Sequence, residues 1–216
     1  NSLSKCIGGL GDALGGAVTD TGLFDWSRYP NIFAAYRKGD AKGWGLQQIR
    51  KKGLRDMGGT LSSHAAHQIA LGAETLSLRM ERHMQNTRRV VEFLAAHPLV
   101  SRVGHPMLES HPSHRLAQQL LPRGAGAVFS FDLKGSRAQG KALVDSLKVF
   151  SHLANVGDCR SLVIHPASTT HSRMDAAALA AAGIGQGTIR LSIGLEDAED
   201  LLDDLKRALK AAAKAA

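Results

Sequence analysis

The chain has 216 residues, 44% of them hydrophobic and 21% charged, a composition that excludes an intrinsically disordered protein and suits one large or two small cores. Its formal net charge of +8 is spread along the sequence, interrupted by acidic residues and without aromatic platforms, so we expect no nucleic-acid partner. No apolar run is long enough to span a bilayer and no signal-peptide pattern is present, so we expect no membrane partner and a cytoplasmic location.

The first part of the chain is expected to combine a strand, an irregular excursion and helices. After a glycine turn, residues 14–19 predict a short strand, which Asp20-Thr21-Gly22 ends. Residues 23–58 alternate glycines with Lys and Arg and predict an excursion with short helices. From residue 62 to residue 97, apolar residues recur mostly at helical spacings. This pattern predicts two consecutive helices or one long bent helix.

Strands and helices then alternate to the end of the chain. The predicted strands are residues 100–103, 127–133, 149–153, 162–164 and 189–193. The predicted helices are residues 113–121, which begin at a serine cap, residues 136–147, and an amphipathic stretch from Asp197 to Lys214. The result is an α/β or α+β domain from about residue 79 onward.

Lys5 lies between two serines and a pair of glycines in the run Ser-Leu-Ser-Lys-Cys-Ile-Gly-Gly. An amine with hydroxyl donors before it and a glycine turn after it suits a site that binds a carbonyl cofactor covalently while the donors hold its phosphate. Pyridoxal phosphate requires such an arrangement. A solvated surface lysine is the alternative, and the octapeptide alone favours it.

Two later segments carry more polar groups than packing requires. Residues 155–158 (Asn-Val-Gly-Asp) and 165–171 (His-Pro-Ala-Ser-Thr-Thr-His) could present amide and hydroxyl donors to a small anion, although ordinary turns explain the same composition. Arg190 lies within an apolar alternating strand. Its guanidinium therefore snorkels, pairs with an internal acid, or binds a carboxylate.

Several other kinds of site find little support. The pairs His64 with His67 and His111 with His114 have spacings that could ligate a metal, but neither has a convincing third ligand, so we predict no metal site. The chain's two cysteines indicate neither a disulfide framework nor a zinc site. No Gly-x-Ser-x-Gly elbow or P-loop is present, which argues against the common hydrolases and NTPases.

Seven segments, in order and at similar spacing, resemble the C-terminal half of the trans-sulfuration enzymes, the Cys/Met metabolism family that uses pyridoxal phosphate. These segments are residues 2–9, 15–20, 24–26, 74–83, 108–112, 153–171 and 189–197. The resemblance runs from residue 1 to about residue 210. It implies an α/β fold of type I, like that of aspartate aminotransferase, with the end of the large cofactor-binding domain in residues 1–78 and a small C-terminal domain in residues 79–216.

The resemblance also implies roles for individual residues. The expected cofactor-binding residues are Ser2, Ser4 and Lys5, and the expected substrate-binding residues are Asn155, Thr170 and Arg190. Lys5 would form the covalent link to the cofactor and move protons as the catalytic residue, while the serines hold the phosphate. Arg190 would hold the substrate α-carboxylate. Asn155 stands where many relatives have a serine that contacts this carboxylate.

Within the family, the resemblance is greatest to the O-acetylhomoserine sulfhydrylases. It implies γ-replacement, in which acetate leaves Cγ of O-acetylhomoserine and sulfide adds to give homocysteine. A cystathionine γ-synthase or γ-lyase would share nearly every residue named. The family's ring-binding residues precede the lysine, so we expect this chain to need a missing N-terminal half for activity, and to form a homotetramer as family members do. A non-catalytic binding or assembly module is the hypothesis of another class.

Overall fold

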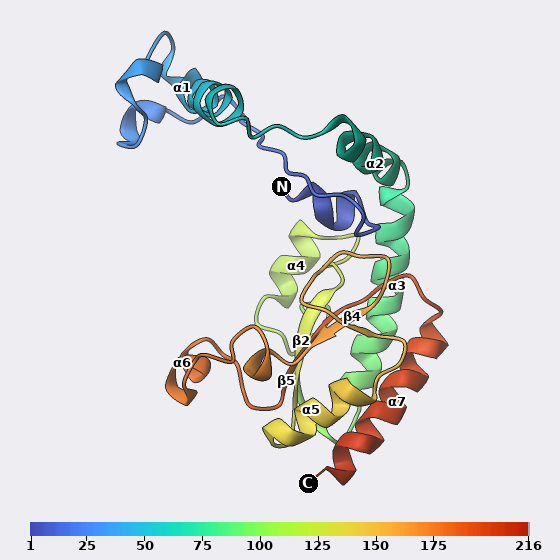
Figure 1. Cartoon of the computed structure of the whole chain (residues 1–216). Helices are drawn as coiled ribbons and strands as arrows, with labels where there is room; N and C mark the ends of the chain where they lie inside the picture. The colour runs from blue at the N-terminus through green and yellow to red at the C-terminus, as the bar shows by residue number, and fades with distance from the viewer. Residues whose placement is uncertain (216) are drawn as a thin grey trace.

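The computed structural model describes residues 1–215 and contains a five-stranded mixed sheet (Figure 1). The strands are β1 (Val100–Gly104), β2 (Val128–Leu133), β3 (Ser151–His152), β4 (Leu162–Ile164) and β5 (Thr188–Ser192). Their order in the sheet is β1-β2-β5-β4-β3, and every neighbouring pair is antiparallel except β3 with β4. Because β5 is central, it has a hydrogen-bonded partner on each side.

Seven α-helices accompany the sheet in the described residues. They are α1 (Trp44–Gln48), α2 (Ser63–Glu74), α3 (Leu76–Ala95), α4 (His114–Leu120), α5 (Arg137–Ser146), α6 (Ala176–Ala181) and α7 (Ala198–Lys214). The helical pattern predicted from residue 62 to residue 97 is confirmed as two consecutive helices, α2 and α3, which meet at Thr75. Helix α6 was not predicted, although Asp175 caps it by accepting a hydrogen bond from the Ala178 amide at 2.7 Å.

One apolar core lies where α3, α5 and α7 pack with the sheet. Its fully buried members include Val90, Val91, Leu94, Phe131, Leu143, Ile189, Leu191, Ile193, Leu201, Leu205 and Leu209. Phe129 and Phe131, predicted to share one face of β2, are both buried. The side chains of residues 189–193 were predicted to alternate between two faces. Their burial does not alternate, because residues on both faces of β5 are buried.

Two predicted strands differ from the structure. Residues 14–19 form no regular strand, and this prediction is wrong: a single bridge joins Gly16 to Ser2, since the segment has no further strand beside it. The strand predicted for residues 149–153 shrinks to two residues. Its first amides are diverted, because the backbone N–H groups of Lys148, Val149 and Phe150 all donate to the buried Asp204 carboxylate at 2.7–3.2 Å.

The helix caps at Asp197 and Ser113 differ in whether the side chain takes part. Asp197, where the predicted amphipathic stretch begins, caps α7 by accepting a hydrogen bond from the Glu199 amide at 2.8 Å. Ser113 occupies the predicted cap position of α4, but its side chain makes no capping hydrogen bond, so only the position of the cap is confirmed. Instead the backbone amide of Ser113 donates to His111 Nδ1 at 3.1 Å, which bends the chain before α4.

Residues 23–58, called the extension here, stand away from the sheet and its helices (Figure 1). The predicted excursion with short helices is confirmed: the extension contains three short 3₁₀ turns, α1 and a π-helical segment from Ile49 to Asp56. Of its apolar side chains, only Ile32 belongs to the buried set, while Leu23 and Met57 are more than three-quarters exposed. The extension therefore has almost no core of its own.

The Asp204 carboxylate predicts a large effect on stability. We expect Asp204→Ala to lower the free energy of unfolding by about 2–4 kcal/mol, because three backbone amides between α5 and β3 lose a charged acceptor in a buried place. Urea denaturation followed by circular dichroism measures the loss. The matched control is Asp203→Asn, one residue earlier on the exposed side of α7, which should leave the midpoint unchanged. Equal losses in both variants would contradict the assignment.

Candidate active site

Lys5 is the third residue of a π-helical turn, Leu3–Ile7, which we call the Lys5 turn. Its own backbone is not helical (φ −97°, ψ −132°), so the turn is distorted where the amine projects. The turn closes through hydrogen bonds from the Gly8 amide to Leu3 O (2.9 Å) and from the Gly9 amide to Lys5 O (2.7 Å). Gly9 has φ +79°, a conformation that side chains oppose. The glycines therefore end the turn directly behind the lysine.

The structure brings Lys5, Asn155 and Arg190 together. Lys5 Nζ donates a hydrogen bond to Asn155 Oδ1, across 150 residues of sequence. Arg190 Nη2 donates to the backbone oxygen of the same asparagine at 3.3 Å. Arg190 lies in the middle of β5, opposite Ser130 of β2 and Ile164 of β4. An amine, an amide and a guanidinium thus meet at the edge of the Lys5 turn.

Gly157 allows the segment that carries Asn155 to lie against the Lys5 turn. A Cβ at this position would come within 2.6 Å of Cys6 Sγ and 2.7 Å of the Cys6 amide, and its φ is +74°. The Gly157 amide donates to Ser192 Oγ at 3.1 Å, and the Cys159 amide donates to Gly9 O at 2.8 Å. Sequence reasoning missed Ser192. The period of two along β5 was the available signal, because it places Ser192 on the same side as Arg190.

The electrostatics leave Arg190 in need of an anion. It is half-buried, desolvation lowers the pKa of its guanidinium below the usual value, and it forms no ion pair within residues 1–215. Burying a guanidinium without a charged partner is costly, and a planar carboxylate offsets that cost with paired hydrogen bonds. The site is therefore suited to bind a carboxylate at Arg190.

The nearest carboxylate in the same loop is already paired. Asp158 is 3% exposed, and Arg160 donates to it from Nε (3.0 Å) and Nη2 (3.1 Å). Burial opposes ionisation of Asp158, but these hydrogen bonds and the Arg160 charge outweigh it and lower the pKa of the carboxyl. Asp158 thus stays ionised with Arg160 as its partner, and no carboxylate forms an ion pair with Lys5 in the part of the chain described.

His83 lies behind this segment and is neutral. Burial lowers the pKa of its imidazole, with Arg79 nearby acting in the same direction. Its Nδ1 faces the Ile193 carbonyl at 2.6 Å, so this nitrogen carries the proton, and Nε2 is buried without a hydrogen-bond partner. His83 therefore supports β5 as a neutral donor.

The other predicted site residues, Ser2, Ser4 and Thr170, form no hydrogen bond with the side chains of Lys5, Asn155 or Arg190. Ser4 Oγ accepts a hydrogen bond from the Gly15 amide at 2.8 Å and donates to Gly15 O at 3.3 Å, so it joins the Lys5 turn to residues 15–17. Ser2 is exposed at the start of the turn. Thr170 is exposed and bonds to His171 Nδ1 at 2.8 Å, without a hydrogen bond to Lys5, Asn155 or Arg190.

The chemistry of these groups fits a carbonyl cofactor. Lys5 supplies a primary amine whose partner is a neutral amide, so no anion has to be displaced when the amine reacts with an aldehyde. The hydroxyls of Ser2, directly before the Lys5 turn, and of Ser4, within it, are of the type that binds phosphate. Arg190 is available for the carboxylate of a second molecule. Together these residues suit an amino-acid substrate that reacts at a lysine-bound aldehyde.

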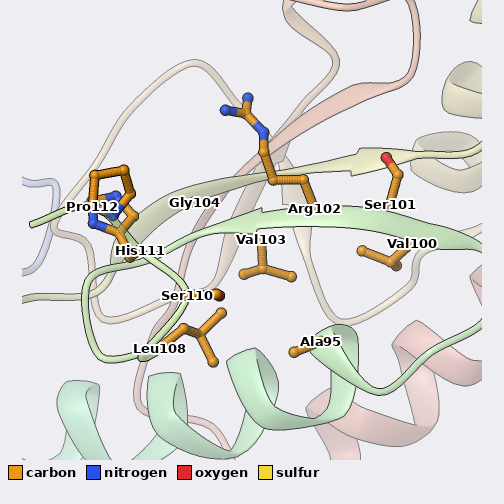
Figure 2. A pocket seen from close by; sticks show the side chains of 10 residues that line it. All are labelled: Ala95, Val100, Ser101, Arg102, Val103, Gly104, Leu108, Ser110, His111 and Pro112. Carbon is orange, nitrogen blue, oxygen red and sulfur yellow. The ribbon is translucent and has the colours of Figure 1, made fainter. Parts of the chain in front are cut away.

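A separate cavity of about 480 Å³ lies beside β1 and contains none of these residues (Figure 2). In Figure 2, Val103 and Leu108 point toward the space between the strand and α3, whereas Arg102 points the other way. Arg102 Nε forms an ion pair there with Asp132 Oδ2 at 2.8 Å. Within residues 1–215, no cluster of three or more His, Cys, Asp or Glu side chains could hold a metal. None of the helices described is long and apolar enough to cross a bilayer.

The chain belongs to the Cys/Met metabolism PLP-dependent enzyme family, whose model matches residues 1–210. It is 43% identical over 219 residues to O-acetyl-L-homoserine sulfhydrylase 1 of Thermus thermophilus, covering 97% of this chain and 52% of that protein. It is 39% identical over 224 residues to homocysteine synthase of Schizosaccharomyces pombe, covering 98% of this chain and 52% of the relative. The chain thus spans about half the length of the curated relatives that it matches.

Solved structures agree with this family and with the predicted type I fold. A Campylobacter jejuni protein assigned as an O-acetylhomoserine (thiol)-lyase, which contains N′-pyridoxyl-lysine-5′-monophosphate, matches with a TM-score of 0.84 at 36% identity, over 96% of this chain and 52% of that one. The cystathionine γ-synthase of Xanthomonas oryzae in complex with cystathionine matches with a TM-score of 0.81 at 35% identity, over 100% of this chain and 50% of that one. The cofactor of the family is pyridoxal phosphate.

The close approach at Gly157 can be tested with two alanine variants. Gly183→Ala introduces a Cβ at φ +70° in open space, so it should cost about 1 kcal/mol of backbone strain. Gly157→Ala has a similar φ but also meets Cys6, and we expect it to lower the free energy of unfolding by roughly 2–4 kcal/mol. Chemical denaturation of both variants gives the difference. If the two losses are equal, the contact with the Lys5 turn does not constrain Gly157.

Proposed function

We propose that the protein is a pyridoxal-phosphate enzyme that exchanges the acetoxy group of O-acetylhomoserine for sulfide, giving homocysteine and acetate in methionine biosynthesis. The observation that carries this proposal is the meeting of the Lys5 amine and the Arg190 guanidinium at Asn155. Relatives named O-acetylhomoserine sulfhydrylase and homocysteine synthase, at about 40% identity, support the choice of reaction.

Lys5 is proposed as the catalytic residue and the covalent anchor of the cofactor. Pyridoxal phosphate, when bound, supplies an electron sink for negative charge that develops on the substrate. Lys5, once released from the cofactor, carries protons at the substrate Cα and Cβ. The Ser2 hydroxyl and the Ser4 hydroxyl bind the phosphate, and Ser4 exchanges its bonds with Gly15 for this purpose. The amine therefore serves in turn as nucleophile and as base.

Arg190, Asn155 and Thr170 are proposed to bind the amino-acid substrate. Arg190 holds the α-carboxylate in a planar fork, which explains why a half-buried guanidinium is placed in a central strand. The Asn155 side-chain NH2 group, which Lys5 does not occupy because Lys5 donates to Oδ1, donates to the same carboxylate. Thr170 contributes from the adjoining exposed loop.

The second candidate is a reaction in which cysteine, rather than sulfide, attacks Cγ. The observation that favours it is the similarity to the cystathionine γ-synthase of Xanthomonas oryzae, whose fold this chain matches along its whole length. Lys5, Asn155 and Arg190 serve both reactions equally, because all three act on the part of the substrate that the two reactions share. The difference therefore lies in the acceptor.

The active protein is proposed to include an N-terminal half beyond this chain, because the matched relatives are about twice as long. An apolar groove of about 990 Å³ between residues 14–18 and residues 46–61 offers a surface that the other half could cover. Residues 1–78 are then the end of the large cofactor-binding domain, and residues 79–216 the small domain. We further propose a homotetramer, as the family resemblance implies, and a cytoplasmic location.

The cofactor assignment predicts a visible absorption band that depends on Lys5. The chain, combined with the rest of the protein and pyridoxal phosphate, should absorb in the visible range and keep the cofactor covalently after borohydride reduction. Lys5→Ala should abolish both, because no amine remains to form the link. The control Lys38→Ala changes an exposed lysine of the extension and should leave both intact. A colourless complete protein would contradict the proposal and favour a non-catalytic module.

The acceptor is tested by competition. We expect O-acetylhomoserine supplied with equal concentrations of sulfide and cysteine to yield mainly homocysteine, measured by mass spectrometry of the products. A predominance of cystathionine would reject the sulfhydrylase assignment and support the γ-synthase. Absence of both products from a protein that shows the Lys5-dependent band would identify the acyl group or the amino acid as wrong.

A further inference from the structure

Arg79 is a buried arginine outside the groups that the proposed reaction uses. It lies in the first turn of α3 and is only 7% exposed. No acidic side chain pairs with it in residues 1–215. Because a buried guanidinium requires compensation, its hydrogen-bond acceptors indicate what it is for.

The acceptors of Arg79 are neutral groups from two helix ends. Its Nη1 donates to Cys6 O at 2.7 Å, and its Nη2 donates to Ile7 O at 3.0 Å, the two carbonyls that directly follow Lys5. The same Nη2 donates to Gly72 O at 2.6 Å near the end of α2, and Nε donates to Thr75 Oγ1 at 3.0 Å. Carbonyls at the ends of helical turns lack partners within the turn and carry partial negative charge, so a cation there is stabilised.

Two glycines make room for this guanidinium and for the contact beside it. A Cβ at Gly9 would lie 2.1 Å from Arg79 Nη1, and the φ of Gly9 is +79°. A Cβ at Gly72 would lie 2.0 Å from Gly8 O, so α2 also presses on the end of the Lys5 turn. The glycine pair after Lys5 therefore serves this packing, whatever else it contributes.

We propose that Arg79 is a positioning residue that fixes Lys5 by holding the two carbonyls behind it. This inference deepens the proposed function and rests on it for its catalytic meaning. Because one guanidinium holds both the Lys5 turn and the joint between α2 and α3, the amine keeps a set position relative to that joint. Lysine in place of Arg79 has a single donor centre and cannot reach acceptors from both elements.

The test follows the reactivity of the Lys5 amine in the full chain, which needs no cofactor. Brief reductive methylation with formaldehyde and borohydride, read by peptide mass spectrometry, gives the rate at Lys5 relative to the exposed Lys38. We expect Arg79→Lys and Arg79→Met to change this ratio by about threefold or more, because the turn that holds Lys5 against Asn155 loosens. Should Arg79→Met fail to fold, Arg79→Lys carries the comparison.

Two controls separate positioning from general loss of stability. Asp204→Asn destabilises the sheet far along the chain, and Arg88→Lys changes an exposed arginine elsewhere on α3. Both should leave the ratio as in the wild type. The proposal is overturned if the Arg79 variants keep the wild-type methylation ratio. It is also overturned if Asp204→Asn changes this ratio equally when each variant is measured at the same interval below its own melting temperature.

A second readout connects Arg79 to the cofactor. With pyridoxal phosphate bound to the complete protein, the pH midpoint of the visible band should shift in Arg79→Lys and stay in place in Arg88→Lys, an exposed arginine of the same helix. A band that keeps its wild-type midpoint in Arg79→Lys would contradict the role in positioning. If the wild type shows no Lys5-dependent band while the methylation ratio still responds to Arg79, the proposed function fails and the positioning of Lys5 by Arg79 stands.

Discussion

The site depends on a close backbone approach between the Lys5 turn and residues 155–159. Gly157 permits it, since any side chain there would enter the space of Cys6, and the Cys159 amide secures it by donating to Gly9 O. Without this approach, Asn155 could not accept from Lys5 while its backbone oxygen accepts from Arg190. Glycines and backbone hydrogen bonds thus set the relative position of these two segments. Lys5, Asn155 and Arg190 therefore meet with few hydrogen bonds between their own side chains.

Strand β5 is the rigid support on the other side of the site. Its neighbours on both edges and its buried residues Ile189 and Leu191 fix its position, so Arg190 and Ser192 project from a well-packed strand. Catalytic and binding groups on packed elements hold their geometry better than groups on loops. The loop that carries Asn155 gains the same precision indirectly, because Ser192 binds the Gly157 amide.

The sequence was a good guide to regular elements and a poor one to interactions across the chain. Helices α2, α3 and α7 and strands β2 and β5 have strong periodicity, and their existence could be predicted without any partner. Residues 14–19 have strand-like composition, yet no strand lies beside them, and the start of β3 is lost to Asp204, 54–56 residues later. Local patterns do not report such competition for backbone amides.

In the site too, the sequence indicated single residues but not the contacts between them. Lys5 and Arg190 attracted notice as unusual residues in their local setting, but their meeting at Asn155 could be expected only from the family resemblance. Arg79 escaped notice because an arginine on an amphipathic helix is ordinarily a surface residue. Its acceptors, Cys6 O and Ile7 O, are backbone atoms more than 70 residues away and leave no mark in composition or spacing.

The extension leaves apolar side chains exposed to water. Its apolar side chains are mostly exposed, with only Ile32 in the buried set, and the groove between residues 14–18 and 46–61 is lined by several of them. Exposed apolar area of this kind is unfavourable in water and is usually covered by another surface. Gly15 lines this groove and also forms hydrogen bonds with Leu3 and Ser4 of the Lys5 turn. The groove and the turn that carries Lys5 therefore meet at Gly15.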